Sequence, residues 1–457
     1  MSAPSTPIVP EARRILGLAW PVMLNSLNWT LLQATDLAVV GLTGTDQVAA
    51  LGASRALTIV AFMITFGILS GVLVFASRAD GAGDLRKTGE AMRDGVALAL
   101  IVGVATTGVL VLLAGPILGL LGVAPHLFDN ASAVTRVMAF AFPPSLVSLA
   151  ISFFLEGISR PRRVMAINLT ILPFNGVLAW AWSGGHFGLP ALGAVGAALA
   201  TLIASVFGAV GMAGAAFLLP DAVERGLRDA RLARIGPAVA GAVRLLRFGI
   251  MPGFSSGLEL AGFAVLIGLS TELSDTAAHA FQLVFSIHNL TFGAAIGLGS
   301  AAGVRAGNAL GEGQPALAVP RTLIAVGLAA LITGAMAALL MIAPGGTIAI
   351  FPATGAVHTL AAAMLFAWAP FILFDAVQLT FLYALRSLGD QVVAGVNSII
   401  AYFLVTGGLG WWLIHRAEAG PMGLVWASGA GMLTAATLHG ARFALVSSRL
   451  RRLRSSA

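Results

Sequence analysis

Three acidic residues inside long apolar stretches of the sequence have no basic residue within a helical turn. Asp36 lies in LLQATDLAVV, Glu259 in SSGLELAGFA and Asp375 in FILFDAVQLT. An unpaired charge at bilayer depth costs on the order of 3 kcal/mol, so an acid in such a place is functional by default. A buried carboxylate can carry a proton near neutral pH or, when ionised, neutralise Na⁺ or an organic cation. The three acids therefore predict cation exchange inside a membrane, and the alternative is that they only hold neighbouring helices together.

Each of these acids lies among other polar side chains. At about 100° per residue, the polar residues of the first apolar stretch fall in an arc of roughly 140°; they are Asn25, Asn28, Gln33 and Asp36. Two serines flank Glu259 on its face, and Gln378 lies one turn from Asp375. A polar stripe on a spanning helix must face protein or water. We therefore predict Asn25, Gln33 and Gln378 as supporting polar groups.

The composition requires a membrane around these acids. Of 457 residues, 58% are hydrophobic and 10% are charged, whereas soluble domains carry about 25% charged residues. With about 20 residues per crossing, the apolar runs predict an all-α polytopic protein with twelve spans. They lie near 15–41, 49–76, 95–122, 133–156, 164–183, 191–219, 246–270, 278–303, 319–343, 359–384, 392–414 and 422–446.

The basic residues set the predicted orientation. Of the 26 Lys and Arg residues, 23 lie on one side of the predicted topology, so the positive-inside rule places both termini in the cytoplasm of a cell with the chain in its inner (plasma) membrane. The predicted domains are a tail (1–14), an N-lobe (15–219), a cytoplasmic linker (220–245), a C-lobe (246–446) and a basic tail (447–457). The net charge of +7 then needs no nucleic-acid partner.

The two halves carry an internal repeat at an offset of about 230 residues. The segment 67–84 lies over 297–314, with Gly67 matching Gly297, and FLEGISR at 154–160 is placed over FLYALRS at 381–387. Because each copy holds an even number of spans, both copies begin on the same side of the membrane, as in a parallel repeat. We expect two six-helix lobes.

Other chemistry is excluded by the motifs that are missing. The sequence has no Cys, no GxxxxGK[ST] phosphate-binding loop and a single lysine, Lys87. Its seven histidines show no HExxH spacing. These absences leave secondary transport as the predicted function, with no cofactor beyond a coupling ion, H⁺ or Na⁺.

The sequence resembles the multidrug and toxic compound extrusion (MATE) family. The resemblance rests on four segments, LAWPVMLNSLNWTLLQATDLAVVG (18–41), LRFGIMPGFSSGLEL (246–260), the run 277–313 and LFDAVQLTFLYALRSLGD (373–390). It implies antiport, in which an organic cation or other amphiphile leaves the cell as H⁺ or Na⁺ enters. The expected partners are such small molecules and the lipid bilayer, and we expect the chain to be a monomer.

The resemblance also assigns roles to residues. Asp36 is similar to the family's first-lobe cation-site acid, with Pro21 bending its helix and with Asn175 and Thr201 as polar partners. Glu259 and Asp375 are similar to the second-lobe acids that bind the coupling cation, Na⁺ among the options, or the cationic substrate. Some members have an Asp one turn after the span 5 Asn, where this chain has Ala179, and this places more weight on the second lobe.

Two alternatives stay open at the sequence level. A lipid-linked oligosaccharide flippase of related architecture is expected to bind anionic headgroups with several intramembrane Arg or Lys residues, of which we count at most Arg305 near a span end. A membrane-embedded enzyme needs a nucleophile, base or metal cluster, which the sequence does not supply.

Overall fold

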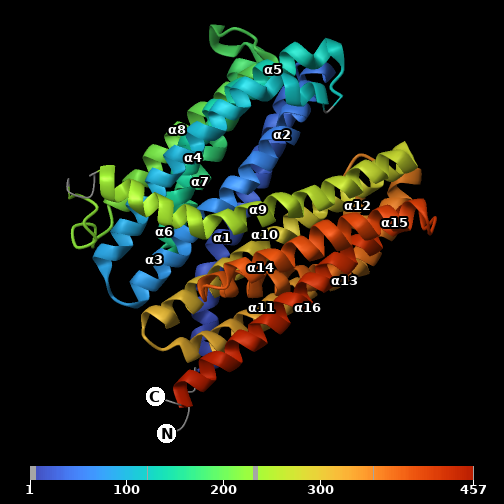
Figure 1. The fold of residues 1–457 in the computed structure, drawn as a ribbon. Coiled ribbons are helices and arrows are strands. Elements are labelled where there is room, and N and C mark those ends of the chain that lie inside the picture. Colours follow the sequence, from blue (N-terminus) through green and yellow to red (C-terminus); the bar gives the residue numbers. More distant parts are fainter. Residues whose placement is uncertain (1–6, 121, 230–234, 354, 456–457) are drawn as a thin grey trace. The chain divides into compact units, whose positions relative to one another are not determined.

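The computed structural model describes residues 7–120, 122–229, 235–353 and 355–455, and every regular element in these ranges is a helix. The helices form two compact units (Figure 1). The unit that we call the N-unit comprises residues 27–79 and 84–253. The unit that we call the C-unit comprises the chain up to Ser26, Asp80–Gly83 and the chain from Phe254 onward. This architecture confirms the predicted all-α polytopic class.

The N-unit is built from six main helices beside parts of α1 and α9. These helices are α2 (Thr45–Leu69), α4 (Leu85–Leu120), α5 (Pro125–Phe140), α6 (Phe142–Gly157), α7 (Pro161–Gly184) and α8 (Gly193–Phe217), with α3 (Gly71–Gly81) after α2 and a 3₁₀ turn, η1 (His186–Gly188), after α7. Helix α7 packs against α8, and α4 packs against α5 and α6. Proline opens α5 and α7 at their first positions, where its missing N–H costs nothing.

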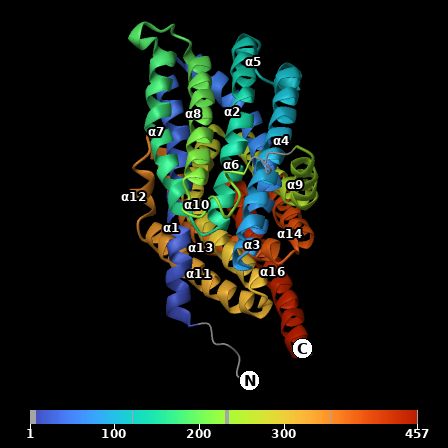
Figure 2. The ribbon, with the colours of Figure 1, turned by 90° about the vertical axis from the view of Figure 1, so that its left-hand side faces the viewer.

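The C-unit is centred on one long helix, α13 (Gly355–Ser387), which packs against α10 (Asp275–Gly311), α11 (Ala318–Ile342) and α16 (Gly420–Ser455). Shorter elements complete the unit. They are η3 (Pro315–Leu317), α12 (Pro344–Ile348), α14 (Gln391–Ser398), the π-helix η4 (Ile399–Leu409) and α15 (Gly410–His415). The start of α1 and the end of α16 lie at the same end of the C-unit in both views (Figures 1 and 2), as expected for an even number of spans.

Two long helices change unit near their middle, and the short helix α3 does so at its last two residues, Asp80 and Gly81. Helix α1 (Ile8–Gly41) belongs to the C-unit up to Ser26 and to the N-unit from Leu27, and α9 (Ile235–Leu273) belongs to the N-unit up to Gly253 and to the C-unit from Phe254. The unit boundaries therefore lie inside the predicted first and seventh spans. The lobes 15–219 and 246–446 divide the chain differently and stay a prediction.

Equivalent glycines in the two halves let a neighbouring helix pack closely against α9 in the N-unit and against α1 in the C-unit. In the N-unit, a Cβ on Gly67 of α2 would lie 2.5 Å from the Pro252 carbonyl oxygen of α9. In the C-unit, a Cβ on Gly297 of α10 would lie 2.7 Å from the Ala19 carbonyl oxygen of α1. Both distances are shorter than a real Cβ contact. The match between Gly67 and Gly297 thus reflects the same close helix approach in each half.

We expect Gly67→Ala to lower the thermal unfolding temperature of the purified protein. The added methyl group meets backbone atoms of α9 that cannot rotate away, and overpacking of this kind costs about 1–3 kcal/mol. Gly52→Ala on the same helix is the control, because a Cβ there meets nothing within 4 Å and alanine favours a helix. Equal unfolding temperatures for the two variants would show that the contact with α9 is unimportant.

The backbone confirms the repeat at the turns that follow α3 and α10. Gly83 and Gly313 both have φ of 69°, a conformation that favours glycine. The hydrogen bonds repeat as well, since the nitrogen of Asp84 donates to Ala79 oxygen at 3.0 Å and that of Gln314 donates to Ala309 oxygen at 3.0 Å. Each pair of equivalent residues is 230 positions apart.

The second repeated segment was predicted in the wrong register. Helix α6 ends at Gly157 and α7 begins at Pro161, whereas α13 ends at Ser387 and α14 begins at Gln391. The turn residue with positive φ is Ser159 in the first half and Gly389 in the second. The segment 154–160 therefore corresponds to 384–390 and not to 381–387. The two phenylalanine-leucine pairs that suggested the other match lie three residues apart in the fold.

The number of spans is close to the prediction. In the part of the chain that the structure describes, ten helices are long and apolar enough to cross a membrane. Helices α5 and α6, bent by 43° at their junction, make an eleventh span if they are counted as one. The predicted span near 422–446 lies in α16, which is not among these eleven, so the count of twelve stays a prediction. Helix α9 already begins at Ile235, inside the predicted linker 220–245. Residues 230–234 of that linker lie outside the described residues.

Candidate functional site

The first candidate site surrounds Asp36 in the N-unit. Its Oδ1 accepts a hydrogen bond from Asn175 Nδ2 of α7 at 2.6 Å, and its Oδ2 lies 3.5 Å from the donating Thr201 hydroxyl of α8. The side chain of Asp36 is only 3% exposed. The structure thus brings together the three residues that the family resemblance places in the first lobe. Ala179, one turn after Asn175, is fully buried and adds no charge.

An arginine from α2 completes this site. The Nη2 atom of Arg55 lies 2.9 Å from Asp36 Oδ2, and its Nη1 donates to the Gln33 carbonyl oxygen at 2.8 Å. The Nε atom of Arg55 is buried and has no hydrogen-bond partner. We name the group Asp36, Arg55, Asn175 and Thr201 the Asp36 site. It is an ion pair with two neutral donors.

The second candidate site surrounds Asp375 on α13 in the C-unit. Its Oδ1 accepts hydrogen bonds from the Tyr402 hydroxyl at 2.9 Å and from Gln378 Nε2 at 3.2 Å. Tyr402 lies on η4, and π-helical segments are frequent at functional sites. The Oε1 atom of Gln378 is buried without a hydrogen-bond partner. An oxygen acceptor is therefore left free beside the carboxylate.

Glu259 belongs to the same site. It is partly buried on α9, in the part of the helix that lies in the C-unit, and interacts electrostatically with Asp375 and with Arg386. Within the described residues, no lysine or arginine lies within 4 Å of either the Glu259 or the Asp375 carboxylate. We name the group Glu259, His288, Asp375, Gln378 and Tyr402 the Asp375 site.

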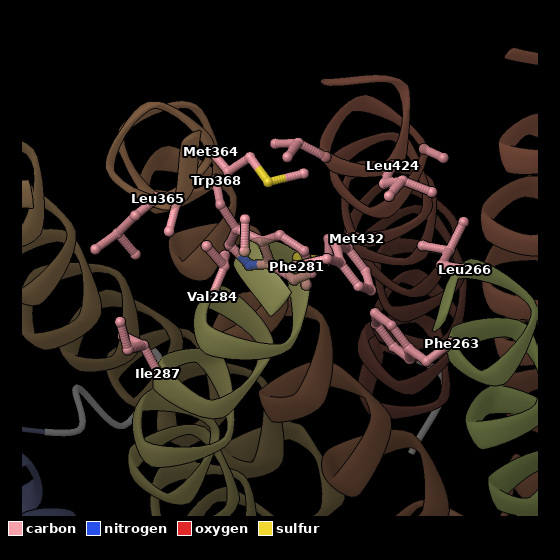
Figure 3. Packing of buried hydrophobic residues seen from close by; sticks show 14 of the residues in the cluster. Phe263, Leu266, Phe281, Val284, Ile287, Met364, Leu365, Trp368, Leu424 and Met432 are labelled. Atoms are coloured by element: carbon pink, nitrogen blue, oxygen red, sulfur yellow. The ribbon is translucent and has the colours of Figure 1, made fainter. Parts of the chain in front are cut away.

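His288 of α10 joins this site to an aromatic cluster. Its Nε2 lies 3.9 Å from Asp375 Oδ2, and its ring centroid lies 5.4 Å from that of Trp368. Figure 3 shows Trp368 beside Phe281 within the apolar packing of the C-unit. The Trp368 Nε1 and the His288 Nδ1 are both buried without a hydrogen-bond partner. The carboxylates of the site therefore border an apolar, aromatic wall.

Three predicted residues do not join the first site as expected. Asn25 lies in the C-unit part of α1, and both its amide atoms are buried without partners. Gln33 supplies its backbone carbonyl to Arg55, and among the described residues its side chain makes no hydrogen bond to the site. Helix α1 continues through Pro21, so the bend there stays a prediction.

The sequence reasoning missed Arg55, His288 and Tyr402 as members of the sites. Arg55 could have been found from the charge pattern, because it is one of three basic residues off the predicted cytoplasmic side and lies within an apolar stretch. Tyr402 is one of only two tyrosines in the chain. A lone histidine in an apolar run carries no signal of a site, and only the structure shows that the buried Nδ1 of His288 has no hydrogen-bond partner among the described residues.

Comparisons with known proteins agree with this architecture. A family model described as MatE matches residues 21–181 and 253–412, one segment in each half, which supports the duplication. A probable multidrug resistance protein NorM of Caulobacter vibrioides is 32% identical over 419 residues, covering 90% of this chain and 86% of that protein. The multidrug resistance protein PmpM of Pseudomonas aeruginosa is 29% identical over 416 residues, covering 88% and 85%.

Solved structures show the same fold. The crystal structure of the eukaryotic MATE transporter AtDTX14 superposes with a TM-score of 0.86 at 20% identity, over 98% of this chain and 99% of that one. The relatives are named as multidrug resistance proteins and the structure as a transporter, which confirms that the chain is not an enzyme. Because the family model covers more than half of the sequence, with buried acids in both matched halves, the chain belongs to the MATE family of membrane transporters.

Proposed function

We propose that this transporter exports organic cations or amphiphiles in exchange for H⁺ or Na⁺. The observation that carries the proposal is the Asp375 site, in which two carboxylates lie without a lysine or arginine within 4 Å among the described residues. Arg386 interacts electrostatically with Glu259 from beyond that distance, so two carboxylates share one guanidinium, and a mobile cation would supply the remaining positive charge. The names of the relatives support drugs or toxic compounds as the exported class.

The donor set suits either coupling ion. The oxygens of Glu259 and Asp375, the Tyr402 hydroxyl and the free Gln378 Oε1 are hard ligands, which Na⁺ accepts. The same carboxylates can instead take a proton. The aromatic wall beside His288 suits the apolar and cationic parts of a substrate, because aromatic faces attract organic cations.

In this proposal the binding site opens alternately to the two sides of the membrane as the two lobes move. The carboxylates exchange substrate for the coupling ion in the course of this cycle. A neutralised carboxylate crosses a dry interior at lower cost than a charged one. We place the protein in the inner membrane as a monomer with both termini in the cytoplasm. The placement of the start of α1 and the end of α16 at one end of the C-unit supports a common side for them (Figure 2).

Three arginines inside the helical units do not favour the flippase alternative, and a fourth, the buried Arg386, interacts electrostatically with Glu259. Arg55 pairs with Asp36, Arg305 pairs with Glu11 at 2.5 Å, and Arg321 pairs with Glu312 at 2.7 Å. An arginine that already has a carboxylate partner is poorly suited to bind an anionic headgroup. A cationic or neutral substrate fits these charges better.

We expect inverted membrane vesicles containing the protein to accumulate the fluorescent cation ethidium when a proton or Na⁺ gradient is imposed. Dissipating the proton gradient with an uncoupler at constant Na⁺, and removing Na⁺ at constant pH, distinguish the two couplings. Vesicles from cells without the protein are the control. If neither gradient drives ethidium or any other tested amphiphile above that control, the proposed antiport is wrong.

A further inference from the structure

The Asp36 site holds a positive charge of its own. Two nitrogens of the Arg55 guanidinium are engaged, one by the Asp36 carboxylate at 2.9 Å and one by the Gln33 carbonyl at 2.8 Å. The Asp36 side chain is 3% exposed and that of Arg55 is 19% exposed. The guanidinium is thus held by two oxygens of α1, as a bound cation would be.

The other groups around Asp36 leave its charge balance unchanged. Asn175 and Thr201 are neutral donors, and Arg55 is the one charged group that interacts with Asp36 in the part of the chain that the structure describes. Ala179 on α7 is buried and contributes no second acid. One negative charge therefore faces one positive charge.

A tethered cation has an advantage over a dissolved one. Arg55 is fixed to α2, so its attraction to Asp36 is intramolecular and loses little translational freedom. A dissolved Na⁺ would have to displace it and leave a guanidinium without its carboxylate in a low-dielectric environment, which is unfavourable. In the described residues the Asp375 site has no arginine or lysine within 4 Å, and Arg386, which interacts with Glu259 from further away, forms no ion pair there that an entering Na⁺ would have to break.

We propose that Arg55 is the resident cation of the Asp36 site, so that this site takes up no coupling ion and the Asp375 site alone does so. The inference deepens the proposed antiport and rests on it. It assigns to Arg55 the role of a specificity-determining residue that fixes how many cations exchange per substrate. Removing its charge would create a vacant cation site at Asp36.

The first test measures ion-dependent stability of the purified full-length protein. Thermal unfolding temperatures are recorded at increasing Na⁺, with ionic strength held by choline chloride, and at several pH values. We expect Arg55→Gln to gain a stabilisation by Na⁺ or by acid of at least about 2 °C beyond that of the wild type, because an ion now binds the native state only. Asp36→Asn/Arg55→Gln should lose this gain, and Arg136→Gln, at an exposed arginine of the same unit, should behave as wild type.

The charge-neutral double variant provides a second test should Arg55→Gln fail to fold. Binding of ²²Na⁺, and proton uptake near neutral pH, well above the ordinary pKa of an aspartate, are counted per molecule for the wild type and for Asp36→Asn/Arg55→Gln. Equal counts are expected, because Asp36 holds no ion in the wild type. A loss of one Na⁺ or one proton in the double variant would overturn the inference, as would an Arg55→Gln protein without the added ion dependence.

These measurements need no transport, so the two proposals fail separately. If the wild type moves no ethidium in either gradient, the antiport fails while the ion counts still decide the role of Arg55. In proteoliposomes that do transport, Arg55→Gln is expected to exchange one more cation per substrate than the wild type. An unchanged ratio in an active Arg55→Gln protein would contradict the inference.

Discussion

Replacing Asp375 with asparagine is expected to abolish ion-coupled export. Asparagine retains an oxygen at the Oδ1 position, so the hydrogen bonds from Tyr402 and Gln378 can persist while the negative charge is lost. A unit charge about 4 Å from a bound cation is worth roughly 4 kcal/mol at an effective dielectric constant of about 20. Even about 1.4 kcal/mol changes an equilibrium constant tenfold. We therefore expect ethidium uptake by inverted vesicles to fall by more than about tenfold.

The matched control is Glu272→Gln. Glu272 lies on α9, the helix that carries Glu259, but its side chain is 61% exposed and its partner is His415 at 3.3 Å. The loss of this acid removes one negative charge from the same unit, on the helix of Glu259, without touching the Asp375 site. Transport by Glu272→Gln should match the wild type. Full activity of Asp375→Asn at normal expression would instead assign the acid to helix packing.

The acids of both sites could be predicted from sequence because carboxylates are costly in apolar surroundings. Asp36, Glu259 and Asp375 are conspicuous against a chain with 10% charged residues. No basic residue lies within a helical turn of any of the three acids in the sequence. A pattern along one helix therefore cannot reveal Arg55 as the partner of Asp36. The partner of Asp36 comes from α2, nineteen positions along the chain, and only the packing of two helices brings it to the carboxylate.

Tyr402 was missed for a different physical reason. In an apolar stretch a tyrosine is ordinarily interpreted as an aromatic at the membrane interface, and nothing in the sequence signals that its hydroxyl reaches Asp375. The residue lies on a π-helix, whose wider turn changes which side chains share a face. A prediction based on 3.6 residues per turn cannot place it. Partners that depend on irregular helix geometry therefore require the structure.

The register of the repeat shows a further limit of sequence comparison. The shared Phe-Leu pair favoured the wrong alignment of 154–160, whereas the turn conformations of Ser159 and Gly389 gave the correct one. In apolar helices many positions accept any of several hydrophobic side chains, so chance matches are frequent. A turn position with positive φ favours glycine over other residues, and for this reason the match of Gly83 with Gly313 was reliable.

The buried ion pair between Glu11 and Arg305 carries the second large prediction. Glu11 lies in the first turn of α1 and accepts two hydrogen bonds from Arg305 of α10, at 2.5 and 2.9 Å. Both residues are less than a tenth exposed. Removing one partner of such a pair leaves an uncompensated buried charge, which costs about 3–5 kcal/mol. We expect Arg305→Gln to lower the thermal unfolding temperature strongly and to reduce the yield of folded protein.

Two variants separate this burial effect from the loss of a salt bridge in general. Glu11→Gln/Arg305→Gln should recover most of the lost stability, because no charge is then left unpaired. Arg442→Gln breaks a pair of the same two-bond geometry with Asp390, at 2.6 and 2.8 Å, whose side chains are 23% and 18% exposed. Pairs in contact with solvent contribute only about 0–1 kcal/mol, so this variant should lose little. Equal losses of stability for Arg305→Gln and Arg442→Gln would show that burial does not strengthen the ion pair between α1 and α10. The start of α1 would then be held mainly by the apolar packing of Ile15 and Ala19.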